Sequence, residues 1–211
     1  MAARETDAQK LICMTEIERE LWAQGHVIAG MDEVGRGPLA GPVVTACVSM
    51  NADHLIPGVN DSKKVAEKKR EKLFERIMAE ADYVKIGWKD PDVIDSINIL
   101  AATRRAMEEC AADFTGSILL IDAVEGLRLP CESRSIIKGD ATSYMIAAAS
   151  IVAKVTRDRY MIELDEKYPM YGFARNKGYG TAEHIAALKE YGPCPAHRRS
   201  FIGNFVDPSR Y

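Results

Sequence analysis

Two adjacent carboxylates, Asp32 and Glu33, stand at the end of an apolar run and are followed at once by a loop rich in glycine and proline. Buried carboxylates are costly to keep charged unless a cation neutralises them, and neighbouring acids repel each other. The loop over residues 35–41 has little side-chain bulk, so another molecule can approach its backbone closely. We therefore predict a metal site beside a backbone-lined groove for a polyanion.

Two further carboxylates stand at similar positions along the chain. Asp122 ends a second apolar run, and Asp140 follows Lys138 and Gly139. Each has a structural alternative, because Asp122 could begin a turn and Asp140 could cap a helix. Hard divalent cations such as magnesium or manganese prefer oxygen ligands, and four carboxylates would suit one or two of them. Two such ions about 4 Å apart can activate a water and stabilise the leaving oxygen of a phosphodiester.

The glycine loop also loosely resembles a dinucleotide-binding fingerprint, but three features disfavour that alternative. The last glycine, Gly41, lies one residue too far along, and Pro38 removes an amide that a phosphate would need. The two acids before the loop would repel a pyrophosphate. An apolar run typical of a strand follows the loop, so no helix N-terminus is available to hold the phosphate.

Composition limits the class of protein. The 211 residues are 47% hydrophobic and 28% charged, which is typical of a globular protein with a full core. The formal net charge is −3, so nucleic-acid binding would depend on a local basic patch or on bridging metal ions. No apolar stretch is long enough to cross a bilayer, and the polar first residues lack a secretory signal.

Five scattered cysteines indicate reduced thiols rather than a disulfide framework. We therefore expect a cytoplasmic protein. Cys194 and His197 have the spacing of metal ligands, but no second pair of Cys or His accompanies them, which disfavours a structural zinc site.

Hydrophobic periodicity predicts an opening hairpin followed by alternating strands and helices. The predicted strands are Val27–Asp32, Val43–Met50, Tyr83–Trp88, Ser117–Asp122 and Ser135–Ile137. The predicted helices are Thr6–Trp22 with Thr6 or Asp7 as N-cap, Lys63–Ala81 capped by residues 60–62, Ile97–Ala111, Asp140 to about Lys167, and Ala182–Tyr191. This order predicts an α/β fold, a mixed five-stranded sheet flanked by helices, in a single domain over residues 1–211.

The run from Gly30 to Val43, GMDEVGRGPLAGPV, resembles the signature of bacterial ribonuclease HII. Later segments resemble the same family in the same order, from about Val27 to Phe201. They are Asn60-Asp61-Ser62-Lys63, Leu120-Ile121-Asp122, Ile137-Lys138-Gly139-Asp140, the run from Ile146 to Val155 with Arg157-Asp158, the run from Asn176 to Thr181, and the run from His197 to Phe201.

The resemblance implies a ribonuclease H-like fold and endonucleolytic cleavage of RNA in RNA–DNA hybrids, including cleavage 5′ of single ribonucleotides embedded in duplex DNA. Its products would carry a 3′-hydroxyl and a 5′-phosphate. By motif position, the catalytic and metal-binding residues would be Asp32, Glu33, Asp122 and Asp140, with manganese or magnesium as cofactor. Such an enzyme would serve ribonucleotide excision repair and DNA replication, and we expect it to be a monomer.

The resemblance also implies the residues that contact the substrate. Gly35, Arg36 and Gly37 would meet the 2′-hydroxyl and the phosphates at the RNA–DNA junction, and Tyr179 would stack on the following deoxyribose. We expect phosphate contacts from Ser62, Lys63, Lys138, Lys154 and Arg198, although a solvated charge is the usual role of a lysine. A small C-terminal helical segment, about residues 181–211, would help to bind substrate.

Two alternatives differ in function. One is a metal-dependent nuclease or phosphotransferase of the same fold with another substrate, such as a DNA junction. The other is a hybrid-binding module without catalysis, which the presence of all four acids disfavours. Some relatives carry a longer C-terminal extension, so we expect weaker hybrid affinity here.

Overall fold

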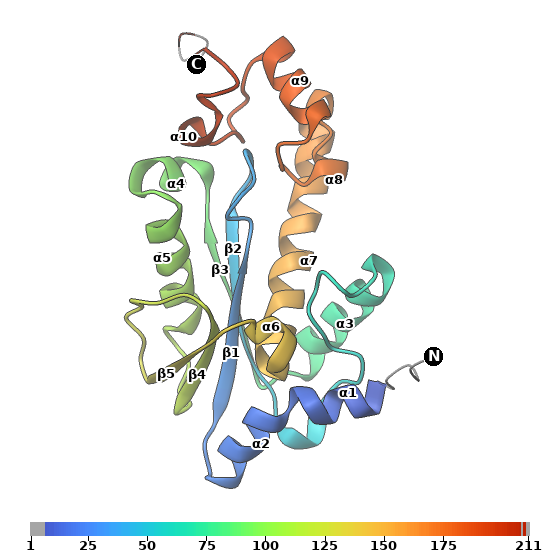
Figure 1. Cartoon of the computed structure of the whole chain (residues 1–211), viewed down its shortest axis with the longest axis vertical. Helices are drawn as coiled ribbons and strands as arrows, with labels where there is room; N and C mark the ends of the chain where they lie inside the picture. Colours follow the sequence, from blue (N-terminus) through green and yellow to red (C-terminus); the bar gives the residue numbers. More distant parts are fainter. Residues whose placement is uncertain (1–6, 208, 210–211) are drawn as a thin grey trace.

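A computed structural model describes residues 7–207 and 209, which are organised around one five-stranded sheet (Figure 1). The strand order is β3-β2-β1-β4-β5. The strands are β1 (Ile28–Val34), β2 (Val43–Ser49), β3 (Tyr83–Lys89), β4 (Ile118–Asp122) and β5 (Glu132–Ile136). β1–β2 and β2–β3 are antiparallel, whereas β1–β4 and β4–β5 are parallel. The predicted mixed sheet and its opening hairpin are thus confirmed.

Helices cover both faces of this sheet. The long helix α7 packs on β1 and β2, with α3 packed against α7, and α5 packs on β2 and β3 from the other side (Figure 1). The helices are α1 (Asp7–Met14), α2 (Glu16–Ala23), α3 (Glu67–Glu80), α4 (Pro91–Ile97), α5 (Ile99–Ala111), α6 (Gly139–Thr142), α7 (Tyr144–Lys167), α8 (Phe173–Asn176), α9 (Ala182–Tyr191) and α10 (Arg199–Ile202), with short 3-10 turns at Ala52–His54 and Pro169–Tyr171.

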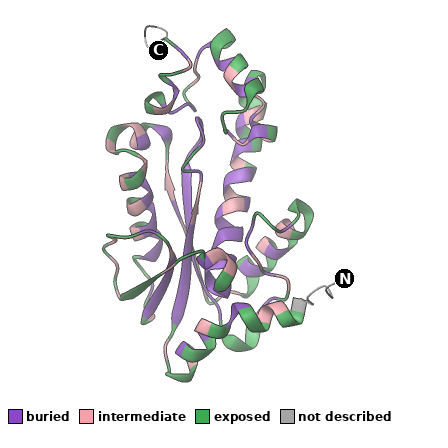
Figure 2. Cartoon of the chain, viewed as in Figure 1, coloured by how far each residue is buried: buried purple, intermediate pink, exposed green. Residues whose placement is uncertain are grey.

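Side chains of β1 alternate between the two helical layers, as the pleat of a strand requires. Ile28 belongs to the core under α7, whereas Ala29 and Met31 pack with Met107 of α5. Figure 2 shows β1, β2 and the middle of α7 buried, with the exposed residues on the outer helices. Because β1 is central and buried on both faces, any carboxylate near its end is held out of bulk water.

Helix α7 lies unusually close to β1 because a glycine faces it. A Cβ atom added to Gly30 would sit 2.1 Å from the backbone carbon of Met145, so no other residue fits there without moving the helix. The small residues at 147–149 of α7 are all fully buried. This contact fixes the start of α7 against the strand that carries Asp32 and Glu33.

Several predicted helices are interrupted where a polar side chain bonds to the backbone. The predicted helix Thr6–Trp22 divides into α1 and α2 at Thr15, whose hydroxyl donates to the Leu11 carbonyl. The predicted helix from Asp140 to about Lys167 divides at Ser143, whose Oγ caps α7 by accepting from the Ile146 amide.

Helix α3 starts later than predicted, at Glu67, so residues 60–62 lie at the start of a turn over 62–64 and do not cap the helix. A short helix, α4, also precedes the predicted helix Ile97–Ala111. At these two places the helix start predicted from hydrophobic periodicity differs from the start in the structure.

The expectations for Thr6 as an N-cap and for the polar first residues fall outside the described residues. Within the described part, no helix is both long enough and apolar enough to span a membrane. All five cysteines are free thiols, as the scattered spacing predicted.

Candidate active site

The sheet register brings Asp32 and Asp122 side by side. In the parallel β1–β4 pair, Met31 lies opposite Ile121, so the next residue of each strand is one of these two acids. Neighbouring strands run about 4.8 Å apart, and residues in register point to the same face of the sheet. Both side chains therefore lie on the face covered by α7, at the carboxyl ends of adjacent strands, where ligand sites of open α/β sheets form.

Asp140 joins them through the loop that leads into α6. The Gly139 amide donates to Asp122 Oδ1 over 2.9 Å, which ties the start of α6 to the end of β4. Asp140 is mostly buried, with 13% of its side chain exposed, and Lys63 Nζ lies 3.6 Å from its Oδ2. Residues from β1, β4 and α6 thus meet at one end of the sheet, although they are far apart in the sequence.

Glu33 completes the group from the strand position next to Asp32. Its side chain is 14% exposed, and Arg36 Nη1 lies 3.3 Å from Oε1. The second oxygen, Oε2, is buried and has no hydrogen-bond partner among the described residues. A buried carboxylate oxygen without a donor is costly, and a cation bound beside it would offset that cost.

The acids perturb one another's protonation. Burial raises the pKa of Asp32 well above its ordinary value, and the charges of Glu33, Asp122 and Asp140 raise it further. Burial also raises the pKa of Glu33 against the opposing charge of Arg36. The pKa of Asp140 is raised by burial and by the charges of Asp61 and Asp122, while Lys63 opposes the shift. Such mutual repulsion is relieved when a divalent cation binds among the carboxylates.

The donor set fits a hard divalent cation. All four predicted ligands are carboxylates, which magnesium and manganese favour. No group of three or more His, Cys, Asp or Glu side chains, within residues 7–207 and 209, has a geometry that holds an ion as it stands.

Arg198 is a buried arginine that supports the glycine loop from the protein interior. Its guanidinium donates to the carbonyl oxygens of Gly35, Arg36 and Gly41 and is fully buried. The prediction that Arg198 meets a phosphate is therefore wrong, because three carbonyls enclose its donors and no solvent reaches it. Its structural role is to fix the direction of the loop.

A second buried arginine, Arg157 of α7, supports the same loop. It donates to the carbonyl oxygens of Ala40, Pro42 and Lys177. Gly35 is required at this position, because its φ is +92° and a Cβ would lie 2.6 Å from the Pro42 carbonyl oxygen. The loop is thus held rigidly by contacts with α7 and with the C-terminal segment.

Gly37 and Tyr179 face each other across the outer side of the loop. A Cβ on Gly37 would meet only Tyr179 Cε1, at 3.9 Å, among the described residues. The Tyr179 side chain is 43% exposed, and Arg36 is also exposed. Packing therefore does not require glycine at position 37, and the surface beside Tyr179 is open.

The remaining predicted phosphate ligands divide into exposed and enclosed side chains. Lys63 and Lys138 are exposed, and Lys63 points toward Asp140. Ser62 is buried, and its amide donates to Ser150 Oγ. Lys154 is mostly buried and forms an ion pair of 2.7 Å with Asp158, so its ammonium already has an anionic partner.

Backbone strain also gathers beside these residues. Of the four non-glycine residues with positive φ in the described chain, Ala123 follows Asp122 and Lys138 precedes Gly139. A third, Lys177, precedes Tyr179 by two residues. Non-glycine residues in this conformation are uncommon and concentrate at functional sites.

Three residues of this region were not predicted to take part. Asp61 is a fifth acid in this region; it is buried, and its charge acts on Asp140. Arg157 and His184 are also buried and polar. Asp61 and Arg157 belong to segments that resemble the family, Asn60-Asp61-Ser62-Lys63 and Arg157-Asp158, and this resemblance could have identified them. Nothing in the sequence distinguished His184.

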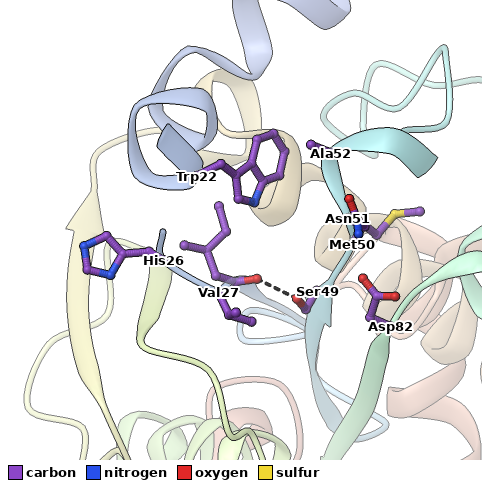
Figure 3. Close-up of a pocket in the computed structure, with 9 residues that line it drawn as sticks. Trp22, His26, Val27, Ser49, Met50, Asn51, Ala52 and Asp82 are labelled. Carbon is purple, nitrogen blue, oxygen red and sulfur yellow. Dashed lines mark hydrogen bonds between the residues drawn. The ribbon is translucent and has the colours of Figure 1, made fainter. Parts of the chain in front are cut away.

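A separate pocket of about 250 Å³ lies at the opposite end of β1 (Figure 3). Trp22, His26, Ser49 and Asp82 are among its lining residues, and the Ser49 hydroxyl donates to the Ile28 carbonyl there. None of the predicted site residues lines this pocket.

Solved structures with this architecture define its class. A ribonuclease H2 from Pyrococcus horikoshii OT3 superposes with a TM-score of 0.69 at 27% identity, over 82% of this chain and 92% of that one. Bst-RNase HIII in complex with Mn²⁺ gives a TM-score of 0.68 at 16% identity, over 83% of this chain and 67% of that one. The fold is therefore that of the ribonuclease H-like nucleases.

Sequence comparison narrows the class to one family. The model of the family "Ribonuclease HII" matches residues 29–204. A ribonuclease HII from Acetivibrio thermocellus is 53% identical over 205 residues, which cover 96% of this chain and 80% of that protein. The chain belongs to the ribonuclease HII family. It is accordingly a ribonuclease H, an endonuclease acting on RNA–DNA hybrids.

Proposed function

We propose that this ribonuclease H cuts on the 5′ side of ribonucleotides embedded in duplex DNA, as well as within longer hybrids, and leaves 3′-hydroxyl and 5′-phosphate ends. The observation that supports this most is the position of the rigid glycine loop directly after the acids of β1. If this loop binds the ribose of the ribonucleotide, the neighbouring carboxylates lie close to the phosphodiester of that ribose, which favours cleavage there.

Asp32, Glu33, Asp122 and Asp140 would hold the divalent cations, manganese or magnesium, in this proposal. Bound there, two ions would activate the attacking water and stabilise the leaving oxygen of the phosphodiester. The buried, unpartnered Oε2 of Glu33 and the raised pKa of Asp32 support the assignment. The Mn²⁺ bound by Bst-RNase HIII, a protein of the same fold, is compatible with it.

Recognition of the ribonucleotide is assigned to Gly35, Arg36, Gly37 and Tyr179. The 2′-hydroxyl distinguishes RNA from DNA at a given site, and it is both a donor and an acceptor. Arg198 draws the carbonyls of Gly35 and Arg36 inward, which leaves the outer side of the loop for the substrate. Tyr179, exposed beside Gly37, would stack on the sugar that follows the ribonucleotide.

Phosphate contacts are assigned to the exposed lysines Lys63 and Lys138 and to the neighbouring Ser62. The segment over residues 181–211 would extend the surface that holds the duplex, because α9 and α10 lie at the same end of the sheet as the glycine loop (Figure 1). In this proposal residues 1–211 act as one domain and as a monomer, in the removal of ribonucleotides from DNA during replication and repair.

The test uses labelled duplex DNA with one ribonucleotide, a full RNA–DNA hybrid, and an all-DNA junction, each with manganese or magnesium. We expect a single cut 5′ of the ribonucleotide, with a 3′-hydroxyl and a 5′-phosphate on mapping, and no cut in the junction. Asp32→Asn should abolish cleavage, while Asp82→Asn, at the far end of the sheet, should cleave as the parent does. Intact single-ribonucleotide duplex at high enzyme, or cleavage of the junction, would contradict the proposal.

A further inference from the structure

Two buried histidines, His184 and His197, contact each other behind the glycine loop. Their Nε2 atoms are 3.0 Å apart, and the two residues are 0% and 3% exposed. The rings of Tyr171 and Phe173 pack against them, with centroids 4.7 Å from His197 and 5.4 Å from His184, respectively. Water is therefore excluded from the pair, and nothing proposed so far uses it.

The neighbouring atoms determine which nitrogen of each ring carries the proton. His184 Nδ1 lies 2.9 Å from the Tyr179 carbonyl oxygen, which only accepts, so Nδ1 must be protonated. A neutral ring has one proton, so His184 Nε2 accepts and His197 Nε2 must donate to it. His197 Nδ1 then accepts, and the Cys194 amide donates to it over 3.0 Å.

The alternative arrangement fails at the contact between the two rings. If His197 Nδ1 donated to the Cys194 carbonyl, 3.3 Å away, its Nε2 would accept and would face the accepting Nε2 of His184. Burial lowers the pKa of both histidines, and that of His197 falls to about 4, so the pair remains neutral at ordinary pH. One continuous run of hydrogen bonds therefore leads from Cys194 to the carbonyl of Tyr179.

The Cys194 thiol lies beside the outer nitrogen of His197, 3.2 Å from Nδ1. The inner nitrogen, Nε2, is already used by His184. The three side chains thus do not face one common point, which argues against the zinc site that the Cys194–His197 spacing could have suggested.

The hydrogen bonds between Cys194, His197, His184 and Tyr179 connect two segments, each of which contacts the glycine loop on its own. The loop before α9 contacts it through the Gly178 carbonyl, which accepts from the Leu39 and Ala40 amides. The segment after Cys194 contacts it through Arg198, which follows His197 directly. The buried histidine pair joins these two segments to each other.

We infer that His184 and His197 are positioning residues that hold Tyr179 in register with Gly37 and so set the affinity for the ribonucleotide junction. The inference rests on the proposed contact of Tyr179 with substrate. It assigns neither histidine to the chemical step, because neither lies among the four acids. Loss of the hydrogen bond to the Tyr179 carbonyl should therefore weaken substrate binding and leave the turnover of bound substrate nearly unchanged.

Two substitutions of His184 separate its two hydrogen bonds. Asparagine places an amide nitrogen near the position of Nδ1 and can still donate to the Tyr179 carbonyl, but it cannot reach His197. Glutamine places its amide near Nε2 and can still accept from His197, but it loses Tyr179. We expect His184→Gln to raise KM about tenfold with little change in kcat, since one buried hydrogen bond is worth about a factor of ten. His184→Asn should raise KM less, and the exposed control His54→Gln should leave both constants unchanged.

A double-mutant comparison tests whether His184 acts through Tyr179. In the Tyr179→Ala background, the Gln and Asn variants should have the same KM, because the side chain that they position is gone. A higher KM for the Gln variant than for the Asn variant that persists in this background would overturn the inference, as would a change in kcat alone.

A measurement on the parent protein keeps the inference testable if a variant fails to fold or if the proposed activity fails. The ¹⁵N chemical shifts of the histidine rings report which nitrogen is protonated. We expect Nδ1–H on His184 and Nε2–H on His197, unchanged from pH 8 to pH 6. Nε2–H on His184 would refute the arrangement whatever the substrate is, whereas absent cleavage of the single-ribonucleotide duplex with the expected shifts would refute the proposed function alone.

Discussion

Replacement of Asp32 by asparagine should stabilise the protein without metal and remove its response to metal. Asp32 is 7% exposed, and its Oδ1 accepts one hydrogen bond, from the Glu33 amide at 2.7 Å. Asparagine keeps that acceptor and carries no charge. Because burial and the charges of Glu33, Asp122 and Asp140 raise the pKa of Asp32, the ionised carboxylate opposes folding at neutral pH.

The size of the effect follows from linkage. Each unit by which folding raises the pKa of an acid lowers the free energy of unfolding by about 1.4 kcal/mol once that acid is ionised. For a chain of about 200 residues, 1 kcal/mol shifts the melting temperature Tm by about 2–4 °C. An acid whose pKa is raised by folding stabilises the folded state at low pH, and this stability is lost as pH rises through the pKa of the folded state. The Tm of Asp32→Asn should therefore exceed that of the parent by more at pH 8 than at pH 5.

Added metal should make the parent protein more stable than Asp32→Asn. Metal at about a hundredfold excess over its Kd stabilises a folded protein by about 2.7 kcal/mol, or roughly 5–10 °C here. The parent should gain that shift with manganese, and Asp32→Asn should gain little of it.

The assay is thermal unfolding with EDTA and with manganese at both pH values, and Asp82→Asn serves as the exposed control. If the variant melted below the parent in EDTA, or gained as much from manganese, the assignment of Asp32 as a buried ligand would be refuted.

Four further variants test separate features of the structure by unfolding in urea and by kinetics. Gly35→Ala should lower the free energy of unfolding by more than about 1 kcal/mol because of its positive φ, whereas Gly37→Ala should keep the parent's stability and raise KM; equal stabilities would contradict this contrast. Arg198→Leu should cost roughly 3–5 kcal/mol, because three buried carbonyls lose their donor, and parent-like stability with weaker substrate binding would instead favour a phosphate contact. Glu18, buried under α7, accepts from the Ser143 hydroxyl and the Met145 amide, and burial raises its pKa above 4.5. Glu18→Gln keeps this acceptor, so its stability relative to the parent should grow as pH rises above about 4.5, and no such growth would show that the carboxylate is well solvated or paired.

The sequence was sufficient for the sheet and for the position of Asp32 and Asp122 at the ends of neighbouring apolar runs. Uninterrupted apolar runs predict buried strands, and a carboxylate that ends such a run lies near the carboxyl end of an inner strand, which is where Asp32 and Asp122 are found. What failed were the helix boundaries at Thr15 and Ser143. A side chain that bonds to the backbone can end a helix inside an otherwise continuous periodic pattern.

The burial of Arg198 was beyond the reach of the sequence for another reason. An isolated arginine is normally solvated, and only the folded backbone shows three carbonyls converging on one guanidinium. The same holds for His184 and His197, which are 13 residues apart and meet only in the folded chain. Long-range polar contacts of this kind leave no periodic signal in a single sequence.

The location of bound metal tests the central claim most directly. Crystals of the protein soaked in manganese should give anomalous difference peaks among the carboxylates of Asp32, Glu33, Asp122 and Asp140, and Asp32→Asn crystals should lose at least one peak. Manganese bound elsewhere, with no density among these four side chains, would contradict the account.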